Sequence, residues 1–530
     1  MGSTVPVLII GAGPAGLTTA IELHRHKIPF RILDKNKKPV KTSNALAIHA
    51  RTLEIWEEQG LLEKALAKGV IIKAVDFYEH DQHILHLSLD LINSVYPFTL
   101  SLPQNLTEEL LTDFLKENNI FVEMEKEVTS IEEKEQHVIC KTKNTHGEIE
   151  EINADWVITC DGAHSFVRKY MNIPFVGNEA HQHFVLADFN SKSPLLSQSF
   201  FIFLSNDGPL IVAQFSKKEC RIIADVSHDN DLKNSTTVSY DQLKKLVSER
   251  CPYVFDVQEP SWTSGFTIRE RLTKKFRHGK IFFVGDAAHV HSPAGGQGLN
   301  MGIQDAVNLS WKLAFVIQNK ANAAILNTYH NERYPLAKSV LRSTAALTRF
   351  ISINTRFFYV FRRFILNLLA TFRFLRKRLT TQFSQTGIRY TDNYLTQDHL
   401  FFLSGPLAGT SLLDIQYALN KKLSDSLRGI ENYLIFFGGE NDINFEEAMQ
   451  LRDRIAQKYR GIFKFILINK QKYFASWTDQ TIFDENHLIH NGYRIKVPSI
   501  YFIRPDKHIG FRGKMTDKEK LMKYLEKIFI

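Results

Sequence analysis

Three glycines near the start of the chain have the spacing that binds a dinucleotide. Gly11, Gly13 and Gly16 follow an apolar run at residues 5–10, and apolar residues then recur at helical spacing over residues 17–24. In such a strand, turn and helix, Gly11 permits the turn, Gly13 lets a pyrophosphate approach the backbone, and Gly16 lets the helix pack on the strand. The N–H groups at the helix N-terminus then face the phosphates.

An acidic residue stands where such a site binds a ribose. The segment FRILDK at residues 30–35 predicts a second strand that ends in Asp34, about twenty residues after the glycines. A carboxylate there can accept hydrogen bonds from an adenosine ribose. The pattern predicts dinucleotide binding but does not distinguish FAD from NAD.

A second glycine-rich turn lies far downstream in GKIFFVGDAAHVHSPAGGQGLNMGIQDA, residues 279–306. A predicted strand at 281–284 delivers Asp286 at its carboxyl end, where open α/β sheets bind ligands. Pro293 and three glycines shape the following loop, and a helix is predicted to begin near Leu299 or Asn300. Its N-terminal amides could cap an anion or an electron-rich ring edge.

Four ordered motifs resemble the class A flavoprotein monooxygenases, the aromatic hydroxylases with the fold of p-hydroxybenzoate hydroxylase. They are GAGPAG with Asp34, RTLEIWEEQGLLE from Arg51, CDGAHSFVRK at 160–169, and GDAAHVHSPAGGQGLNMGIQDAVNLSWKLA at 285–314. The resemblance implies that both turns bind a single FAD. One long cofactor would then explain two turns in one chain.

The resemblance also implies a set of cofactor contacts. It assigns the first turn to the ADP half, Arg51 and Gln104 to the pyrophosphate and ribityl region, Asp286 to the ribityl chain, and Asp161 to contacts that serve both FAD and the nicotinamide. Asn44 stands where many relatives carry a basic residue, so we assign it no role. The expected FAD-binding residues are Gly11, Gly13, Pro14, Ala15, Gly16, Asp34, Lys35, Arg51, Gln104, Val128, Asp161, Asp286, Pro293, Gly295, Gly296, Gly298, Leu299 and Asn300.

The activity implied is hydroxylation of an aromatic, phenolic or polycyclic compound. NADPH or NADH would reduce the flavin, which would react with dioxygen to give a C4a-hydroperoxide; the protein supplies orientation and excludes water. A phenol reacts better as a phenolate, so a proton acceptor or positive group near it would help. The sequence leaves that group open among His49, Arg221, Arg271 and His291, and an exposed or ion-paired role is the stronger expectation for Arg221.

No metal site is expected. His289 and His291 form an HxH pair, but no companion cluster of Cys, Asp or Glu has matching ligand spacing. We therefore attribute the pair to the loop structure of the family.

The expected fold combines α/β and α+β parts. A Rossmann-like FAD-binding domain is interleaved with a substrate-covering β-sheet, and a thioredoxin-like domain follows. We assign FAD-binding parts to residues 1–75, 101–174 and 271–340, and a substrate-domain segment and its β-sheet to 76–100 and 175–270. A basic amphipathic helical region at 341–400 and the thioredoxin-like domain at 401–530 complete the chain.

The C-terminal third resembles the last domain of phenol-hydroxylase relatives, including an RPD segment in IRPDKHIGFR. It contains no CxxC, so thiol exchange is not expected and the domain is interpreted as structural, with a homodimer interface left open. Thr516 and Glu519 predict a capping box for a last helix whose Leu521, Tyr524, Leu525 and Ile528 share one face.

Composition restricts the remaining possibilities. The net charge of +9 could suggest a nucleic-acid surface, but the excess is concentrated at residues 340–380, which carry nine Arg and Lys and no acidic residue, so no nucleic-acid partner is expected. That segment could lie on an anionic membrane, although we favour packing against the FAD domain. No secretion signal or spanning segment is recognised, which predicts a cytoplasmic protein with reduced, packed cysteines.

Two other functions stay open at this point. A flavoprotein hydroxylase could act at a membrane on a lipid quinone, with residues 340–380 touching the bilayer. Alternatively, the chain could retain flavin as a binding or assembly protein without turnover.

Overall fold

The structure is a computed structural model, and it divides into two compact units. The first comprises Met1–Ile21, Phe30–Ala306 and Leu336–Thr386, and the second comprises Glu22–Pro29, Val307–Pro335 and Gly387–Ile530. Asn44, to which we assigned no role, lies outside the described residues. The structure describes residues 3–38, 45–79, 81–191, 198–251, 253, 256–352, 356–391, 393–400, 405–439, 444–470 and 477–530.

A parallel sheet forms the base of the first unit. Strand β1 (Ser3–Ile10) pairs in parallel with β2 (Phe30–Leu33) and β10 (Ile149–Thr159), and β10 pairs in parallel with β17 (Ile281–Phe283). Residues 7–9 are fully buried, as the continuous apolar run predicts for a strand covered on both faces. Helix α1 (Pro14–Arg25) begins four residues after β1 ends, which confirms the predicted strand, turn and helix.

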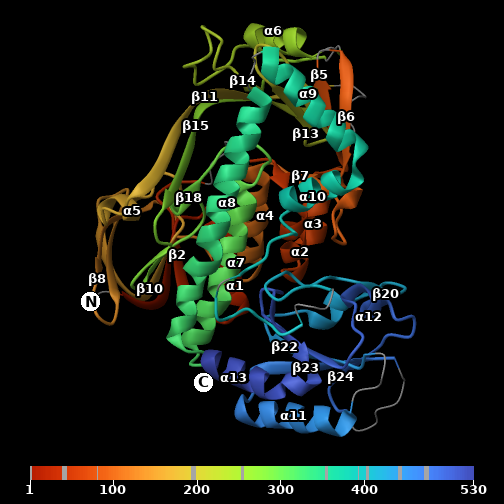
Figure 1. The fold of residues 1–530 in the computed structure, drawn as a ribbon. Coiled ribbons are helices and arrows are strands. Elements are labelled where there is room, and N and C mark those ends of the chain that lie inside the picture. Colours follow the sequence, from red (N-terminus) through yellow and green to blue (C-terminus); the bar gives the residue numbers. More distant parts are fainter. Residues whose placement is uncertain are drawn as a thin grey trace. The chain divides into compact units, whose positions relative to one another are not determined.

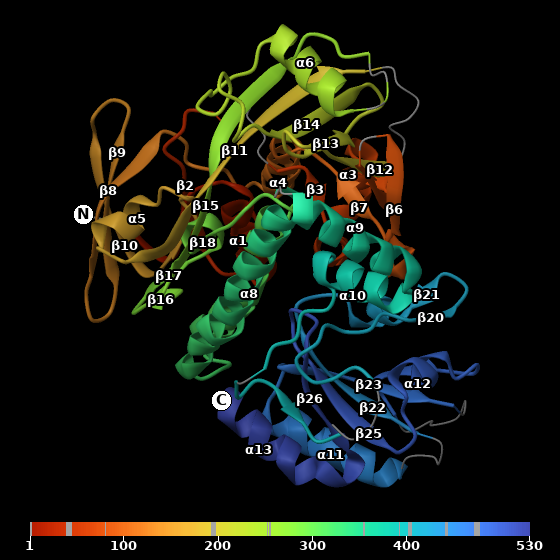
Figure 2. The same cartoon turned by 45° about the horizontal axis from the view of Figure 1, so that its top comes forward.

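An antiparallel extension continues this sheet. Strand β8 (Lys126–Glu133) pairs with β9 (Val138–Asn144), which pairs with the first half of β10, while β16 (Arg277–His278) pairs with β17 at the other edge. The hairpin of β8 and β9 projects from the sheet in Figure 2. Val128 is buried in β8, opposite Thr142 of β9.

An eight-stranded sheet forms the second layer of this unit, in the order β18-β15-β11-β14-β13-β12-β5-β6. Its longest strands, β11 (Phe175–Asn190) and β15 (Trp262–Thr273), run side by side over most of its height (Figure 1). The others are β5 (Ala74–Glu79), β6 (Gln82–Ser88), β12 (Ser199–Leu204), β13 (Leu210–Gln214), β14 (Glu219–Asp225) and β18 (His289–Val290).

The remaining elements of the first unit are a small sheet and several helices, of which α7 (Gly298–Ile317) continues into the second unit. A small sheet orders β3 (Ala47–Ile48), β7 (Thr99–Ser101) and β4 (Val70–Ile72). The helices are α2 (Ala50–Glu58), α3 (Leu62–Lys68), α4 (Gln104–Glu117), α5 (Phe166–Tyr170) and α6 (Tyr240–Arg250). Helix α7 begins one or two residues earlier than predicted.

The basic segment is helical and packs on the eight-stranded sheet with one face. Helices α8 (Asn327–Ser352), α9 (Arg356–Thr371) and α10 (Arg373–Phe383) span it, and α9 lies along β6 (Figures 1 and 2). Leu366 of α9 and Ile351 of α8 are buried against Phe77 of β5 and Leu85 of β6, which form a hairpin. The other face exposes apolar side chains at Val360, Phe361, Phe364, Phe372 and Phe374. None of the described helices is both long and apolar enough to cross a membrane.

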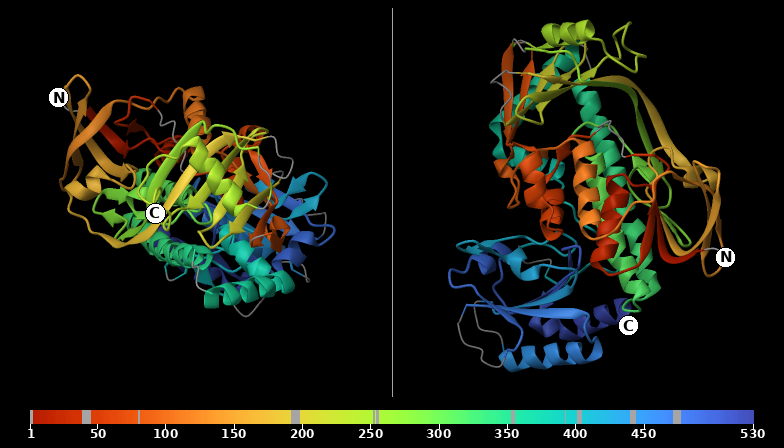
Figure 3. Two further views of the ribbon diagram at one scale, coloured as in Figure 1. Left: turned by 90° about the horizontal axis from the view of Figure 1, so that it is seen from above. Right: turned by 180° about the vertical axis from the view of Figure 1, so that it is seen from behind.

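The second unit is built on a six-stranded mixed sheet in the order β19-β26-β25-β22-β23-β24. Its strands are β19 (Gln397–Asp398), β22 (Asn432–Phe437), β23 (Phe463–Asn469), β24 (Gln480–Phe483), β25 (Ser499–Ile503) and β26 (Ile509–Lys514). Helices α11 (Phe445–Lys458) and α13 (Lys518–Ile528) lie on one face and α12 (Leu488–Tyr493) on the other (Figure 1 and the right view of Figure 3).

The predicted capping box of the last helix is wrong, although its apolar face is correct. Helix α13 begins at Lys518 without a side-chain cap, and Thr516 lies in the preceding 3-10 turn (Met515–Asp517). The carboxylate of Asp517 accepts a hydrogen bond from the backbone N–H of Lys514, so an acidic side chain closes this turn one residue after the predicted threonine. The four predicted core residues of the helix, Leu521, Tyr524, Leu525 and Ile528, are all buried.

Buried charges fix the RPD segment within the second unit. The guanidinium of Arg504 donates to Glu332 at 2.6 and 3.0 Å and to Asp506, and the ammonium of Lys312 donates to Glu332 at 2.7 Å. Arg504 and Lys312 hold the pKa of Glu332 at about 2 although burial opposes ionisation. This segment therefore has a structural role.

Candidate FAD and substrate site

One pocket in the first unit borders both glycine-rich turns. Its cavity volume is about 470 Å³, and it is lined by residues 13–15 of the first turn and by residues 284–286 and 290–299 around the second. Segments almost three hundred residues apart in sequence therefore face the same space. Of the residues predicted to hold the cofactor, the pocket brings together Gly13, Pro14, Ala15, Gln104, Asp286, Pro293, Gly295, Gly296, Gly298 and Leu299.

Each of the three glycines of the first turn is explained by a different feature of the structure. Gly11 has φ +101°, and a Cβ there would lie 2.4 Å from the carbonyl oxygen of Cys160. A Cβ on Gly16 would lie 1.9 Å from the carbonyl oxygen of Gly11, so only glycine fits between helix and strand. A Cβ on Gly13 would meet no protein atom within 4 Å, so this glycine faces open space at the start of α1. The position that the protein leaves open is the one that a pyrophosphate needs.

Asp34 is fixed beside this turn rather than in the lining of the pocket. Its Oδ2 accepts a hydrogen bond from the backbone N–H of Ala12 at 2.8 Å, and its Oδ1 accepts one from Asn36 at 2.8 Å. Each carboxylate oxygen has a second acceptor position, so the group can still accept from a ribose hydroxyl. The neighbouring Lys35 is exposed.

Asp286 projects into the pocket from a 3-10 turn (Gly285–Ala287) that follows β17. The group lies deep in the protein, and this burial is the main reason that its pKa is raised, while His289 opposes the shift and Asp305 adds to it. The side chain is nevertheless exposed, because it faces the pocket. It is therefore available to a ligand with hydroxyl groups.

Asn300 braces the second turn instead of lining the pocket. Its side-chain amide donates to the carbonyl oxygens of Ala47 and Gly296 at 2.8 Å, and its carbonyl accepts from the backbone N–H of His49 and the hydroxyl of Thr52. All hydrogen-bonding positions of this buried side chain are thus occupied by protein. Asn300 fixes the loop against β3 and α2.

The segment CDGAHSFVRK at residues 160–169 contains one buried oxygen that lacks a protein partner. The Oδ2 atom of Asp161 accepts a hydrogen bond from the backbone N–H of Val167 at 3.2 Å, whereas Oδ1 is buried without a partner. Burial raises the pKa of this carboxyl. Ser165 caps α5 by accepting from the N–H of Arg168, and Arg168 packs over the ring of Phe175 at 3.8 Å.

Arg51 and Gln104 each have a protein partner. The guanidinium of Arg51 donates to Glu54 at 2.7 Å, and the amide of Gln104 donates to Glu108 at 2.9 Å. Burial raises the pKa of Glu108 to about 7, although the hydrogen bond from Gln104 opposes this shift. Gln104 lines the pocket, whereas Arg51 and Val128 lie outside its lining.

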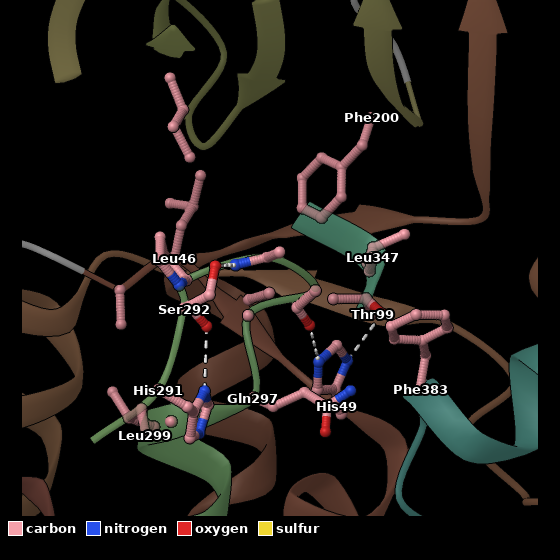
Figure 4. A pocket seen from close by; sticks show the side chains of 18 of the residues that line it. Leu46, His49, Thr99, Phe200, His291, Ser292, Gln297, Leu299, Leu347 and Phe383 are labelled. Atoms are coloured by element: carbon pink, nitrogen blue, oxygen red, sulfur yellow. Dashed lines mark hydrogen bonds between the residues drawn. The ribbon is translucent and has the colours of Figure 1, made fainter. Parts of the chain in front are cut away.

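The two candidate histidines in the pocket differ in which nitrogen is occupied. His49 Nε2 lies 2.7 Å from the carbonyl oxygen of Gly295, so Nε2 carries the proton, and Nδ1 contacts the Thr99 hydroxyl at 3.4 Å. His291 Nδ1 lies 2.9 Å from the carbonyl oxygen of Ser292, which requires the proton on Nδ1 (Figure 4). His291 Nε2 is therefore an acceptor, and it has no protein partner.

Burial keeps both imidazoles neutral. It lowers the pKa of His49 to about 4 against the hydrogen bond to Gly295, and it lowers that of His291 to about 4 with a further contribution from His289. The neighbouring His289 has a different partner, because its Nε2 is hydrogen-bonded to Asp305 at 2.7 Å in the core. The two imidazoles of the HxH pair thus make separate hydrogen bonds, one to Asp305 and one to the Ser292 carbonyl oxygen.

These low pKa values predict a loss of stability on acidification. His26, His49 and His291 all have a pKa of about 4 in the folded protein, below the ordinary value of about 6.5. Because the unfolded chain binds more protons in this range, the free energy of unfolding should fall as the pH drops from 6.5 towards 4. Urea unfolding at several pH values should show this fall, and His26→Phe should reduce its slope; an unchanged slope would contradict the assignment.

The two arginine candidates have different environments. Arg221 lines the pocket but is fully buried, and its Nε and Nη2 donate to the two oxygens of Asp188 at 2.7 Å. This confirms the ion-paired interpretation of Arg221. Arg271 lies in β15, paired across from Val290 of β18, and outside the residues that line the pocket.

The sequence analysis missed the apolar wall of the pocket. Phe200 lines the pocket, whereas the nearby Phe201, Phe203 and Phe215 pack in cores. The alternation of apolar residues in the strands could have indicated these residues, but the sequence did not show which face of the sheet borders the pocket. The missed apolar lining residues are Val75, Phe77, Leu87, Leu89, Ile92, Ile202, Ile211, Ala213, Ile223, Leu347, Ile351, Leu379 and Phe383.

The pocket has features that fit a long, partly anionic cofactor. The open space at Gly13 lies at a helix N-terminus, and two residues of the lining, His291 and Gln297, have buried Nε2 atoms without protein partners. Asp161 Oδ1, also without a partner, lies between the lining residues Cys160 and Gly162. A dinucleotide supplies phosphates for the first feature and hydrogen-bonding ring edges for the others. The donor set contains no feature that excludes FAD.

Comparisons with known proteins agree with this geometry. Residues 4–344 match the FAD binding domain family. The chain is 33% identical over 383 residues to an uncharacterized aromatic compound monooxygenase, YhjG, of Bacillus subtilis (strain 168), a match that covers 72% of this chain and 76% of that protein. It is 31% identical over 396 residues to 6-methylpretetramide 4-monooxygenase of Streptomyces rimosus, covering 74% and 71%. The structure of OxyS anhydrotetracycline hydroxylase from Streptomyces rimosus matches 99% of both chains at 26% identity, with a TM-score of 0.77.

The chain belongs to the FAD binding domain family, the family of the class A aromatic hydroxylases. It is an FAD-dependent aromatic monooxygenase, and NAD(P)H is the co-substrate expected for this family. None of these matches supports the lipid-quinone enzyme or the non-catalytic flavin protein.

Proposed function

We propose that the pocket holds one extended FAD, with its phosphates at Gly13 and its ring system beside residues 295–299. The observation that carries this proposal is that both glycine turns border a single cavity. Asp34 and Lys35 lie at the adenosine end, with Val128 in the nearby part of the sheet. Arg51 and Gln104 serve the middle of the cofactor, Asp286 its ribityl hydroxyls, and Asp161 the nicotinamide and flavin. Gly11, Gly16 and Asn300 act by shaping the two turns.

The apolar part of the pocket would receive a polycyclic phenolic substrate. Its wall continues from the second turn across β5, β12, β13 and β14 to α8 and α10. When bound, the flavin accepts a hydride from reduced nicotinamide and activates dioxygen for transfer of one oxygen atom to an aromatic ring. The apolar side chains orient the ring system and exclude water. The relatives that act on pretetramide and anhydrotetracycline compounds support a substrate with several fused rings.

We assign proton acceptance from the substrate hydroxyl to His291. Of the four candidates, His49 has both nitrogens engaged, Arg221 is paired with Asp188, and Arg271 lies outside the lining. His291 Nε2 has a lone pair without a protein partner, so it can accept a hydrogen bond from a substrate hydroxyl, although burial lowers the pKa of this imidazole to about 4 and opposes full protonation. A substrate hydroxyl within hydrogen-bond distance of Nε2 would ionise as the oxygen transfers.

Replacement of His291 should separate catalysis from cofactor binding. His291→Asn can preserve a donor to the Ser292 carbonyl oxygen but removes the Nε2 acceptor, so product formation should fall by about 10²- to 10⁴-fold. Flavin content should not change, and the rate should partly recover at alkaline pH, where a phenol ionises without help. Product formation measured over a pH series tests this; equal rates for the two proteins would exclude His291.

The proposed function can be tested by a screen of phenols and fused-ring compounds. Purified protein should oxidise NADPH or NADH faster in the presence of its substrate, and mass spectrometry should find a product with one added oxygen atom. Compounds with a charged carboxylate should perform poorly, because the only arginine that lines the pocket within the described residues is already paired with Asp188. Stimulated oxidation that yields only hydrogen peroxide would contradict the substrate assignment.

We also propose that the second unit contains a thioredoxin-like domain over residues 401–530. The order β22, α11, β23, β24, α12, β25, β26, α13, with β22, β23 and β24 parallel and β25 and β26 antiparallel to their neighbours, supports this fold. The domain would be structural, with a homodimer interface as one role. For the rest of the chain we propose the domain boundaries assigned from the sequence: three FAD-binding segments, two segments of the substrate-covering sheet, and the helical region at 341–400. A supply of NAD(P)H supports a cytoplasmic location.

A further inference from the structure

A cluster of side chains that could bind a metal ion lies on the hairpin of β5 and β6, on the face opposite the pocket. His83 Nε2 and His86 Nδ1 each lie 2.8 Å from the same oxygen, Oδ1 of Asp76. The three ligand atoms all lie within 4.8 Å of one another. Two imidazole nitrogens and a carboxylate oxygen form a donor set that suits Zn²⁺ and related transition cations.

A β-bulge brings the two histidines together. Residues three apart in a regular strand point to opposite faces of the sheet. In this hairpin Asp76 is paired with His86, Phe77 with Leu85, and Tyr78 with His83, so the register shifts by one residue at Ile84. The shift turns His83 to the face of Asp76 and His86. Bulges commonly re-aim side chains at functional positions, and here the bulge is what creates the cluster.

The carboxylate is prepared for a ligand role. Asp76 is buried, while the side chains of His83 and His86 are 43% and 56% exposed, so a cation could reach the cluster from solvent. Burial alone would raise the pKa of Asp76, but hydrogen bonds from His86, His83 and Ser199 hold it below its usual value. The contact with Ser199 orients the carboxylate from the neighbouring strand β12, as outer partners do in metal sites.

We propose that Asp76, His83 and His86 form a binding site for a divalent transition cation of the Zn²⁺ type. Each neutral imidazole would then carry its proton on the ring nitrogen that faces away from Asp76, and water would complete the coordination of the cation. Hard cations such as Mg²⁺ and Ca²⁺ prefer sites with more oxygen ligands and would not compete. This site does not depend on the proposed binding of FAD.

The position of the cluster gives the cation a structural consequence. Strand β6 is the edge of the eight-stranded sheet, and β5 is its partner in that sheet. The opposite face of the same hairpin carries Val75, Phe77 and Leu87, which line the substrate pocket. A cation that joins Asp76 to the two histidines would therefore clamp the edge strand and fix one wall of the pocket.

The test uses untagged, full-length protein that has been treated with a chelator and then titrated with ZnCl₂. Calorimetry at pH 7.5 should show one saturable site per chain, and the melting temperature should rise with Zn²⁺ until that site is full. Lowering the pH should weaken binding, because protons compete for the histidine nitrogens. Mg²⁺ at the same concentrations should produce neither effect.

Matched variants make the site falsifiable. His83→Gln and His86→Asn place an amide N–H near the imidazole nitrogen that it replaces, so the bond to Asp76 and the fold can persist while the metal ligand is lost. Each variant should weaken Zn²⁺ binding at least tenfold, and the double variant should abolish it. His146→Gln, at an exposed histidine on another hairpin, should leave binding unchanged.

A crystal of the Zn²⁺-loaded protein should show an anomalous scattering peak about 2.0–2.2 Å from all three ligand atoms. Zn²⁺ binding that survives in the double variant, or a peak elsewhere, would overturn the proposal. Failure of Zn²⁺ to bind the unmodified protein would do the same. Flavin content, measured in parallel, reports on the proposed FAD site separately.

Discussion

Gly13→Val should yield a folded but colourless protein. A Cβ at this position meets no protein atom within 4 Å, so the apoprotein can accommodate the side chain. The same side chain would enter the space proposed for the pyrophosphate at the N-terminus of α1. FAD affinity should fall by about 100-fold or more, which corresponds to roughly 2.8 kcal/mol.

The measurement is a titration of apoprotein with FAD, followed by flavin fluorescence, with circular dichroism to check the fold. Gly16→Ala is the contrasting variant, because its Cβ would lie 1.9 Å from the carbonyl oxygen of Gly11 and disturb the packing of α1 itself. We expect that variant to lose thermal stability as well as flavin. If Gly13→Val bound FAD tightly, the proposal that the phosphates lie at this turn would be wrong.

Arg221→Met should destabilise the first unit strongly. Arg221 is fully buried and holds Asp188 by two hydrogen bonds of 2.7 Å across the pair of strands β11 and β14. Its loss leaves Asp188 as an uncompensated charge with a side chain only 13% exposed, a change that typically costs about 3–5 kcal/mol. The free energy of unfolding in urea measures this effect.

A double variant separates the charge from the packing. Arg221→Met with Asp188→Leu removes both charged groups, so much of the lost stability should return. If the single and double variants were equally unstable, the damage would come from the volume of the arginine and not from the unpaired carboxylate. A single variant as stable as the original protein would show that the ion pair contributes little.

Local sequence patterns predicted the two turns because each depends on residues close together in the chain. Gly16 is required by its contact with Gly11 inside the strand, turn and helix, and Gly11 by the positive φ of the turn itself, so the spacing alone indicates both. Asp286 follows directly from the end of a buried strand. Such patterns could not show that Gly13 and Gly298 border the same cavity, which depends on the order of strands in the sheet.

The chemistry of individual groups was less predictable. The histidines at 49 and 291 look equivalent in sequence, and only the carbonyl oxygens of Gly295 and Ser292 determine which nitrogen carries the proton. Asn300 was expected to border the flavin, but its side chain is fully used to brace the loop. The cluster at Asp76 arises from a one-residue register shift in a hairpin, and a regular alternation of side chains would not have placed both histidines on one face.

The central claim is that one FAD spans both turns and supports oxygen transfer to an aromatic ring. It is tested most directly by reducing the FAD-loaded protein with NADPH or NADH without air, then adding isotopically labelled dioxygen and a phenolic substrate found by the screen. We predict rapid bleaching of the flavin and a product that carries one labelled oxygen atom. Failure of the protein to bind FAD, or a product whose added oxygen comes from water, would contradict this account.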